Sequence, residues 1–534
     1  MSKFIKILLL LYNFIFVLFL ITNIFDFDFG WHLRFGKEWL ENGFFPYLDS
    51  YTYPHLGQLW VNHEWGGDLL YWLMYKNIGY YPLSLITSLA VLIGFIIAQK
   101  AYNKYDLSAA LVTTFLIWSN YHIFAPRLAM FSLVFFSIFL YTLQNLERKK
   151  YYQFWPLLFW LWSFLHGSFT LGFIVIGIYF SGNLLNCFFQ KYYPKLSLGQ
   201  SWKKTTFNNV LIWTGLSLMM IFLNPYGWHL PKETISYFFY DFYKTHVTEW
   251  LSSNTFPIFW KTGLFIAPAL VAVFWQIKKK VFSWAEFLLF LGLLYISFKH
   301  KRQVIYLALF CQPLFSIFLL KIKEDFLKVP QWKTFLENKK IKILAFIVGT
   351  SLIFYSSYLY LPHIKLYKDV WPHIKNIGYY MPVDAIEFLN QEIGLQKKVK
   401  IFNEFGWGAY MNWTLPQGLV FLDGRGTATW KIPGSEITTL ETYYNWRYYK
   451  SEGLREIEKQ KVQYIILENM SSFKPKINRV NSWLFAPEPL KHATTLAPDK
   501  LEEDLKINSN WQLIYTDDRA NIWKFLPIIP LEIK

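Results

Sequence analysis

Cysteine and charge are both scarce in this chain. Only two cysteines occur in 534 residues, Cys187 and Cys311, and both lie inside apolar stretches. They cannot form a disulfide framework, and no CxxC pair indicates a zinc site. Charged residues make up 17% of the sequence, whereas hydrophobic residues make up 54% and aromatic residues 21%. This composition argues against a large soluble enzyme and is typical of a polytopic membrane protein.

Acidic residues are fewer than basic ones, and the formal net charge is +17. In a soluble protein such an excess would suggest a nucleic-acid partner. Here most of the excess lies in short lysine-rich segments between apolar stretches, which the positive-inside rule of membrane proteins explains more simply. We therefore expect no binding to nucleic acid.

Apolar stretches of membrane-span length recur along the first two thirds of the chain. They predict eleven spans, at residues 7–25, 80–98, 108–122, 129–145, 152–166, 169–188, 207–223, 257–276, 282–298, 303–320 and 342–360. Lys3 and Lys6 precede the first of them, as in a signal peptide. No small-residue cleavage pattern follows, so we expect a retained span.

The basic residues between the spans predict an orientation. With the N-terminus in the cytoplasm, the inner segments carry Lys100 and Lys104, Arg148 to Lys150, Lys191 and Lys195, Lys278 to Lys280, and Lys321, Lys323 and Lys328. The sequence thus predicts a multi-pass plasma-membrane protein whose residues after 360 lie outside. One basic cluster, Lys299 to Arg302, falls on the outer side. Either a span is miscounted or this cluster binds an anion such as a phosphate.

The segment from 361 to 534 has a different pattern. Five strand-like runs are expected, at Val399–Asn403, Gly418–Leu422, Val462–Leu467, Trp511–Thr516 and Ala520–Phe525, with helices at Val383–Glu392 and Glu436–Lys459. Asp517-Asp518-Arg519 predicts a hairpin turn between the last two strands. The expected fold is a polytopic α-helical membrane domain at 1–360, followed by a smaller extracytoplasmic α/β domain at 361–534.

The first external loop, residues 26–79, is rich in ionisable side chains. It contains Asp28, His32, Asp49, His63, Glu64 and Asp68. Carboxylates and imidazoles among tryptophans and tyrosines at a membrane surface suit proton transfer on a substrate held at the lipid–water boundary.

Further polar residues fall on the same outer side, namely Asp26, Arg127, His166, Asn224, His229, Glu249 and the cluster Lys299 to Arg302. Their concentration on one face predicts a shared cavity. The alternative is that outer loops are simply longer and leave more room for polar residues.

Short motifs in the order of the chain carry a family resemblance. In the first loop they are Asp28-x-x-x-His32-Leu33, Pro46, Asp49-Ser-Tyr-Thr52, Gly57, Trp60 and His63-Glu64-Trp65. Further along come Pro126-Arg127, Met130-Phe131-Ser132, Trp162 to His166-Gly167, Asn224-Pro225-Tyr226-Gly227, Glu249-Trp250, Arg302, Phe402-Asn403, Gly406-x-Gly408-x-Tyr410 and Asp423-Gly424-Arg425. Together they resemble GT-C-fold glycosyltransferases of the bacterial multi-span group related to protein mannosyltransferases and the lipid A aminoarabinose transferase. Arg127 follows its proline rather than preceding it, which leaves its role open.

The resemblance implies transfer of a sugar from a polyprenyl-phosphate carrier to a glycan, lipid or protein acceptor on the outer face. An acidic residue at the start of the first loop is then the base; Asp28 fits best, Asp26 is the fallback, and Glu64 is a third catalytic candidate. The leaving lipid phosphate needs cationic stabilisation, for which the candidates are Arg302, Lys299 and Arg127. The remaining candidates for binding the substrate are His32, His63 and His166.

Several alternatives remain open at this point. Asp26 and Asp28 could instead cap a helix at Phe29–Leu40. His63 and Glu64 could bind a divalent metal with Asp28 and His32, although the spacing matches no metal motif and the closer relatives imply no cofactor. Asp423-Gly424-Arg425 is either a structural turn with an ion pair or part of an acceptor site.

At the level of function, the rivals are a transporter or flippase of a lipid-linked or anionic substrate and a non-catalytic scaffold for envelope assembly. Transporters usually place their sites near mid-membrane, whereas the ionisable residues here cluster at one face.

Overall fold

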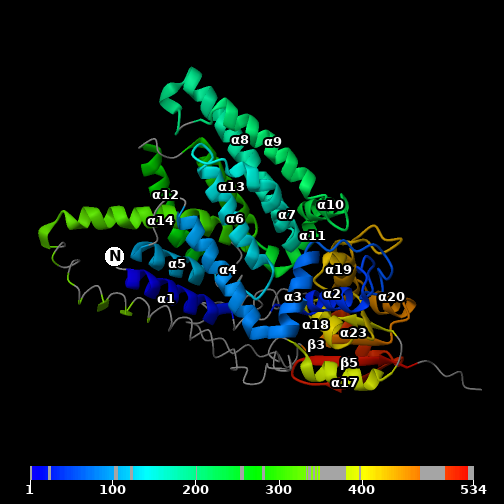
Figure 1. The fold of residues 1–534 in the computed structure, drawn as a ribbon. Helices are drawn as coiled ribbons and strands as arrows, with labels where there is room; N and C mark the ends of the chain where they lie inside the picture. The colour runs from blue at the N-terminus through cyan, green and yellow to red at the C-terminus, as the bar shows by residue number, and fades with distance from the viewer. Residues whose placement is uncertain are drawn as a thin grey trace, which may run out of the picture.

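The computed structural model describes residues 3–21, 26–100, 106–120, 124–199, 201–252, 258–278, 283–331, 381–395, 398–469 and 499–526, with a few single positions between 334 and 351. A helical region and an α/β region lie side by side, and the first external loop lies where they meet (Figure 1). The expected domain boundary at residue 360 lies outside the described residues.

Long helices make up the helical region. They are α1 (Lys3–Ile21), α4 (Tyr80–Lys100), α5 (Leu107–Ser119), α6 (Ala129–Gln144), α7 (Trp155–Leu165), α8 (Phe169–Tyr192), α9 (Lys204–Met220), α12 (Ile258–Lys278), α13 (Trp284–Lys299) and α14 (Val304–Leu327). Each of the first ten expected spans overlaps one of them, and most of the eleventh lies outside the described residues. By length and composition, three described helices could cross a membrane, Pro82–Lys100, Phe169–Tyr192 and Lys301–Leu327. The number of spans stays a prediction.

Aromatic and aliphatic side chains fill the space between these helices. Phe136, Phe159 and Trp162 belong to one buried cluster that runs through the region. Polar contacts also cross between helices, because a buried polar group needs a partner. Gln312 Nε2 of α14, for example, donates to Thr113 Oγ1 of α5 at 2.7 Å.

The first external loop folds into two helices, α2 (Phe29–Asn42) and α3 (Trp65–Ile78), joined by an irregular segment. Helix α2 lies between α3 and the α/β region. A Cβ added at Gly30 would overlap the carbonyl group of Ala409, and one added at Gly36 would overlap that of Asp68. Glycine at these two positions therefore allows α2 to contact both neighbours backbone to backbone.

The α/β region contains the five expected strands, β1 (Val399–Asn403), β2 (Gly418–Val420), β3 (Tyr464–Glu468), β4 (Trp511–Thr516) and β5 (Ala520–Phe525). Their order in the sheet is β2-β1-β3-β5-β4. β1 is parallel to β2 and β3, whereas β5 is antiparallel to β3 and β4. The predicted hairpin turn is confirmed, since Asp517 N–H donates to the Ala520 carbonyl at 3.0 Å.

Helices cover this sheet, namely α17 (Val383–Ile393), α18 (Gly408–Thr414), α19 (Thr439–Tyr444), α20 (Gly453–Lys459) and α23 (Lys500–Ile507). The prediction of one helix over Glu436–Lys459 was wrong, because a π-helical segment at Asn445–Tyr449 and a turn at residues 451–452 separate α19 from α20. A Cβ added at Gly453 would overlap the Trp446 carbonyl group, so this glycine allows the chain to fold back on itself.

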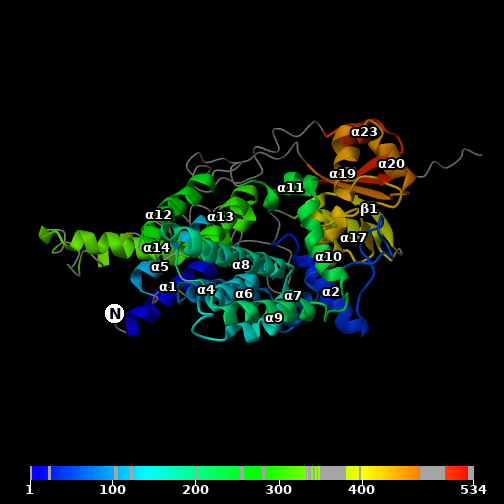
Figure 2. The same cartoon turned by 90° about the horizontal axis from the view of Figure 1, so that it is seen from above.

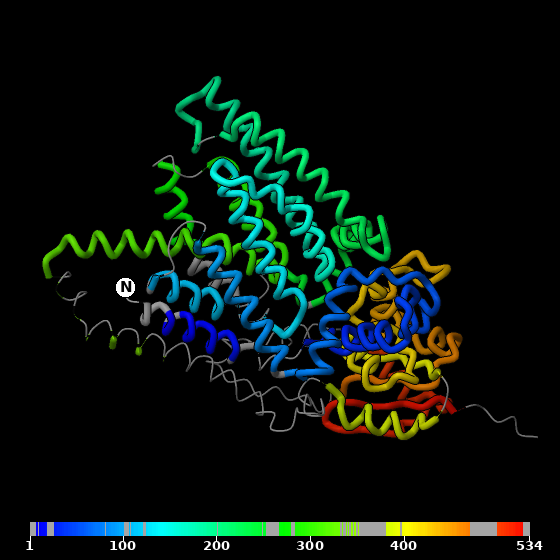
Figure 3. The backbone as a smooth tube through the Cα atoms, viewed as in Figure 1, coloured from blue at the N-terminus to red at the C-terminus, as the bar shows by residue number. Residues whose placement is uncertain are grey.

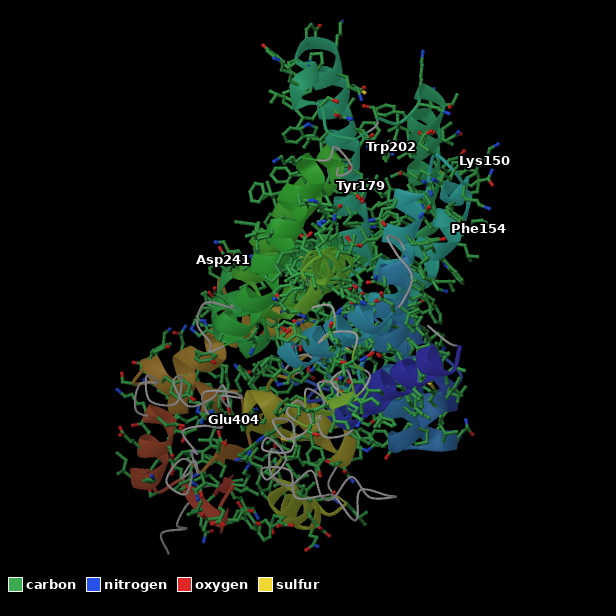
Figure 4. The ribbon with its side chains drawn as sticks, turned by 90° about the vertical axis from the view of Figure 1, so that its left-hand side faces the viewer. Lys150, Phe154, Tyr179, Trp202, Asp241 and Glu404 are labelled. Carbon is green, nitrogen blue, oxygen red and sulfur yellow. The ribbon has the colours of Figure 1, made fainter. Side chains whose placement is uncertain are left out.

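The first loop also joins the sheet of the α/β region. Tyr53 N–H donates to the Val420 carbonyl, and Val420 N–H donates to the Tyr51 carbonyl, both at 3.0 Å. Thr52 and Val420 thus form a parallel bridge that extends the sheet beyond β2. Two views show α2, in blue, against the yellow and orange α/β elements (Figures 2 and 3). Lys150 and Phe154 lie toward the far end of the helical region from Glu404 (Figure 4).

Candidate active site

The turn Asp26-Phe27-Asp28 enters α2 and presents two carboxylates. Asp26 is buried, and its Oδ1 accepts the backbone N–H of Asp28 at 3.1 Å. Asp28 occupies the N-cap position of α2, but its side chain makes no capping hydrogen bond. The capping interpretation of Asp28 is therefore wrong, and its carboxylate is left for another role.

The two oxygens of Asp28 have different surroundings. Oδ1 accepts a hydrogen bond from Trp31 Nε1 at 3.3 Å. Among the described residues, no hydrogen bond or ion pair involves Oδ2, and the residue is partly exposed. Burial and the neighbouring Asp26 carboxylate raise the pKa of Asp28 to about 6, although Arg127 opposes the shift. At neutral pH this carboxylate is ionised and more basic than an ordinary aspartate.

Carboxylates and guanidinium groups alternate beside Asp28. Arg127 donates from Nη2 to Asp26 Oδ1 and from Nη1 to Glu249 Oε1, each at 2.7 Å. Arg302 Nη1 then lies 3.5 Å from Glu249 Oε2. Burial would raise the pKa of Glu249, but Arg127 and Arg302 hold it at about 2. Arg127 is thus paired on both sides.

Arg302 is the more open of these two arginines. Its side chain is 26% exposed, and its guanidinium lies 5.1 Å from the centre of the Trp250 ring. Lys301 N–H donates to the Leu251 carbonyl at 2.9 Å, which holds the short helix of Arg302 (Lys301–Gln303) against that of Glu249 (Thr248–Trp250). Lys299 is exposed, with Nζ 5.9 Å from the Tyr295 ring centre. The structure therefore brings Arg302, but not Lys299, to Glu249.

On the other side of Asp28, His32 is held by an aspartate. His32 Nδ1 lies 2.6 Å from Asp68 Oδ1, and Asn62 Nδ2 donates to Asp68 Oδ2 at 2.6 Å. Burial alone would lower the pKa of His32, but Asp68 and Glu64 together raise it to about 9. His32 is therefore a buried imidazolium at neutral pH, paired with the Asp68 carboxylate.

Glu64 lies between two imidazoles. Its Oε2 is 3.5 Å from His32 Nε2, and its Oε1 is 3.2 Å from His166 Nε2. Ser168 N–H donates to His166 Nδ1 at 3.1 Å, so the proton of a neutral His166 is on Nε2 and points at Glu64. Burial raises the pKa of Glu64 to about 8, against the opposing charge of His32. Glu64 can thus keep a proton at neutral pH.

His63 extends this imidazole group. Its ring centre is 6.4 Å from that of His166 and 5.6 Å from that of Tyr237. Burial, with the positive charges of His32 and Arg302, lowers its pKa to about 4. His63 is therefore neutral at physiological pH and suited to hydrogen bonding rather than to ion pairing.

Ligand atoms of His32, Glu64 and Asp68 lie within 4.8 Å of one another, a group that could hold a metal ion. This set differs from the sequence-based alternative, which included His63 and Asp28. Both Asp68 oxygens already accept hydrogen bonds, and an imidazolium has no lone pair for a metal until it loses its proton. The donor set fits a proton-sharing cluster better than a metal site.

The contacts that the structure describes for Asn224 and His229, two further residues predicted for the shared cavity, are local ones. Asn224 closes its own turn, since its Nδ2 donates to the carbonyls of Ile221 and Gly227 at 2.7 and 2.9 Å. His229 begins α10 (His229–Ser236), with its ring centre 4.2 Å from that of Trp228. Their membership of the cavity stays a prediction.

Arg425 of the motif Asp423-Gly424-Arg425 forms an ion pair, as one of the two sequence-based interpretations expected. It is 1% exposed, with Nε 2.8 Å from Asp423 Oδ2 and Nη2 2.9 Å from Asp49 Oδ1. Its guanidinium also lies 4.5 Å from the ring centre of Tyr51 and 4.3 Å from that of Trp60. Sequence reasoning missed that this turn contacts the first loop, because no local pattern links positions more than 370 residues apart.

No protein-family model and no curated protein matches this sequence. Among solved structures, it is similar to the archaeal oligosaccharyltransferase AglB from Archaeoglobus fulgidus in complex with an inhibitory peptide and a dolichol-phosphate. The TM-score is 0.50 at 10% identity, over 99% of this chain and 75% of that one. The apo form of the Archaeoglobus fulgidus oligosaccharyltransferase gives 0.48 at 10% identity, over 88% and 70%. The similarity to the AglB complex supports the expected GT-C-type fold. Membership of the bacterial group related to protein mannosyltransferases stays a prediction.

Proposed function

We propose that this chain is an integral membrane glycosyltransferase. It moves a sugar from a polyprenyl-phosphate-linked donor to an acceptor on the extracytoplasmic face. The observation that carries the proposal is that one site contains both a base and a cation. Asp28 offers a carboxylate oxygen without a hydrogen bond, and Arg302 offers a partly exposed guanidinium. The fold agrees, because the similar archaeal oligosaccharyltransferase was solved with a dolichol-phosphate.

In the proposed reaction Asp28 is the base. Its Oδ2 takes the proton of the acceptor hydroxyl while the hydroxyl oxygen attacks the anomeric carbon of the sugar. A new carbon–oxygen bond forms as the bond from that carbon to the phosphate oxygen breaks, and the lipid phosphate leaves with the electron pair. Attack opposite the leaving group inverts the configuration at this carbon.

Arg302 stabilises the charge that develops on the departing phosphate. A guanidinium has N–H donors in a fork that matches phosphate oxygens. Arg127 contributes to phosphate binding indirectly. It donates a hydrogen bond to Glu249 Oε1 and so weakens the attraction between Glu249 and Arg302, which leaves Arg302 available to the phosphate. Phosphate contact is thus assigned to Arg302, and Arg127 orders the two carboxylates beside it.

The imidazole–carboxylate group forms the other wall of the site. His166 Nε2 lies 3.2 Å from Glu64 Oε1 and His32 Nε2 lies 3.5 Å from Glu64 Oε2, so these three side chains order one another in a buried setting. We assign the neutral imidazole of His63, beside this group, to a hydroxyl of the sugar or of the acceptor. No metal is assigned to the reaction, because the positive charge it needs is present on Arg302.

Purified protein incubated with radiolabelled polyprenyl-phosphate sugars and candidate glycan, lipid and protein acceptors tests the proposal. Label should move from the lipid to an acceptor, in chelator as well as in buffer with divalent metal. A flippase would move the lipid between leaflets of a vesicle with its sugar–phosphate bond intact, and a scaffold would do neither. Transfer that stops in chelator and returns with added metal would overturn the metal-free assignment.

A further inference from the structure

The turn that leaves β2 reaches into the proposed site from the α/β region. It consists of Asp423, Gly424, Arg425 and Gly426, named here the 423–426 turn. A Cβ added at Gly424 would overlap Asp28 Oδ1 and lie 3.0 Å from Asp28 Cγ. The backbone of Gly424 therefore lies directly against the carboxylate assigned as base.

The next glycine of this turn makes a second close approach. A Cβ added at Gly426 would lie 2.8 Å from both Glu233 Oε1 and the Tyr237 hydroxyl. Glu233 belongs to α10, and Tyr237 directly follows that helix. The 423–426 turn thus lies between the entry to α2 and the end of α10, and a side chain at either glycine would have to displace the side-chain atoms that it meets.

The 423–426 turn is held firmly in this position. Arg425 anchors it to the first loop through Asp49, at 2.9 Å. Asn412 Nδ2 of α18 donates to Asp423 Oδ2 at 2.7 Å, and a Cβ added at Gly408 would lie 2.8 Å from Asp423 Cα. With an ion pair on one side and backbone packing on the other, the turn has little room to move away from Asp28.

We propose that the 423–426 turn positions the carboxylate of the base, with Gly424 as a positioning residue. The proposal rests on the proposed function, in which Asp28 is the base. Trp31 Nε1 holds Oδ1 from within α2, and Gly424 blocks it from the opposite element, so the carboxylate plane is confined and Oδ2 faces the acceptor. Without Gly424, only the 3.3 Å hydrogen bond from Trp31 would restrain the Asp28 carboxylate within its rotamer.

The α/β region is by this inference part of the active site. It supplies one wall of the pocket around the base, although it contributes no reacting atom. Fixing a base within a fraction of an ångström is worth much in rate, because a displacement of about 1 Å can cost on the order of 10²-fold. The membrane part alone would restrain the Asp28 carboxylate only through Trp31, from one side.

Gly424→Ala in the full-length purified protein is the central test. The added methyl group should displace the Asp28 carboxylate and lower kcat by about 10²-fold, with the donor KM changed less than about threefold. Gly406→Ala is the matched control, since its added Cβ would meet no atom nearer than Phe27 Cδ1 at 3.9 Å. It should keep wild-type kcat.

A double variant separates positioning from general damage. In Asp28→Asn/Gly424→Ala, kcat should equal that of Asp28→Asn alone, because the group being positioned has already lost its function. Losses that multiply would overturn the proposal. If Asp28→Asn is inactive while Gly424→Ala is fully active, only the positioning claim fails; if Asp28→Asn is itself fully active, the assignment of the base fails.

A second double variant tests the inference in case Gly424→Ala does not fold. If Gly424→Ala does not fold, Asp28→Ala/Gly424→Ala should fold and bind a labelled polyprenyl-phosphate sugar, because the overlapping carboxylate oxygen has been removed. Failure of that double variant to fold would place the clash elsewhere and refute the inference.

Discussion

The two arginine clusters of the site, one around Arg425 and one around Arg302, contain the same chemical groups. They differ in how far the guanidinium is exposed to solvent. Arg425 is 1% exposed, bonded to Asp423 and Asp49. The side chain of Arg302 is 26% exposed, its nearest carboxylate is 3.5 Å away, and one aromatic ring lies beside it. Arg425 is closed off from solvent, although its Nη1 has no hydrogen-bond partner among the described residues, so we assign it to structure, whereas the more exposed Arg302 can still bind an anion.

The two aspartates at the start of α2 differ in the same way. Asp26 is 1% exposed and holds Arg127 at 2.7 Å, although its Oδ2 is buried without a hydrogen bond among the described residues, whereas Asp28 is partly exposed and its Oδ2 can be reached by a ligand. Neighbours in sequence thus divide into one structural and one available carboxylate. The comparison predicts which substitutions damage the fold and which damage only the reaction.

The largest effect is expected from Asp28→Asn. The amide keeps the shape of the side chain but cannot take a proton at neutral pH, so the transfer rate should fall by roughly 10²–10⁴-fold. Stability in detergent should stay near wild type, because Asp28 makes no capping bond. Initial rates with a labelled donor measure the loss.

Asp26→Asn is the control for that comparison. It weakens the ion pair with Arg127 and should lower the melting temperature more than Asp28→Asn does. A larger loss of rate in Asp26→Asn, with Asp28→Asn still active, would move the base to Asp26. Activity that survives both changes would remove catalysis from this turn.

Arg425→Ala should destabilise the protein strongly. Breaking a buried ion pair leaves uncompensated charge on Asp423 and Asp49, which typically costs about 3–5 kcal/mol. Arg425→Lys should restore little, since one ammonium cannot span two carboxylates as the planar guanidinium does. The measurement is chemical or thermal unfolding in detergent, and a wild-type transition for Arg425→Ala would contradict the assignment of this cluster to structure.

Arg302→Ala should act on the donor and leave the fold intact. Loss of a charge-assisted contact to a phosphate costs on the order of 1.5–3 kcal/mol, so use of the donor should weaken by about 10- to 150-fold. Lys299→Ala, an exposed site beside Tyr295, is the matched control and should keep the wild-type donor KM. An unchanged donor KM in a folded Arg302→Ala protein would leave the phosphate without its proposed ligand.

The smallest expected effect is on pH dependence. Asp28 has a pKa of about 6 and works only when ionised, so kcat/KM should rise with pH through about 6. The same raised pKa means that folding favours the protonated form. The contribution of Asp28 to stability is therefore present at low pH and lost as the pH rises through 6. From pH 5 to 7 the rate should rise while the melting temperature falls. In Asp28→Asn the rise in rate should vanish, and the fall in melting temperature should become smaller without vanishing, because Glu64, with a pKa of about 8, still contributes to it.

Sequence patterns predicted the elements better than their contacts. The strands from Val399 to Phe525 were found because alternation and a turn at Asp517–Arg519 are local signals. The break between α19 and α20 was missed, since helix propensity over Glu436–Lys459 does not reveal that Gly453 must contact Trp446. The approach of Gly424 to Asp28 depends on tertiary packing across most of the chain, which no residue spacing encodes.

The bridge between Thr52 and Val420 also has a consequence for how the protein is made. Ribosomes synthesise the first loop early, yet its partner strand emerges more than 360 residues later, so the Tyr51–Tyr53 segment waits with unpaired backbone groups. Unpaired strand segments attract other chains and promote aggregation. Until the partner strand has been made, a nascent chain therefore exposes a segment that a chaperone can shield. The Gly424 backbone likewise reaches Asp28 only after most of the chain has been made.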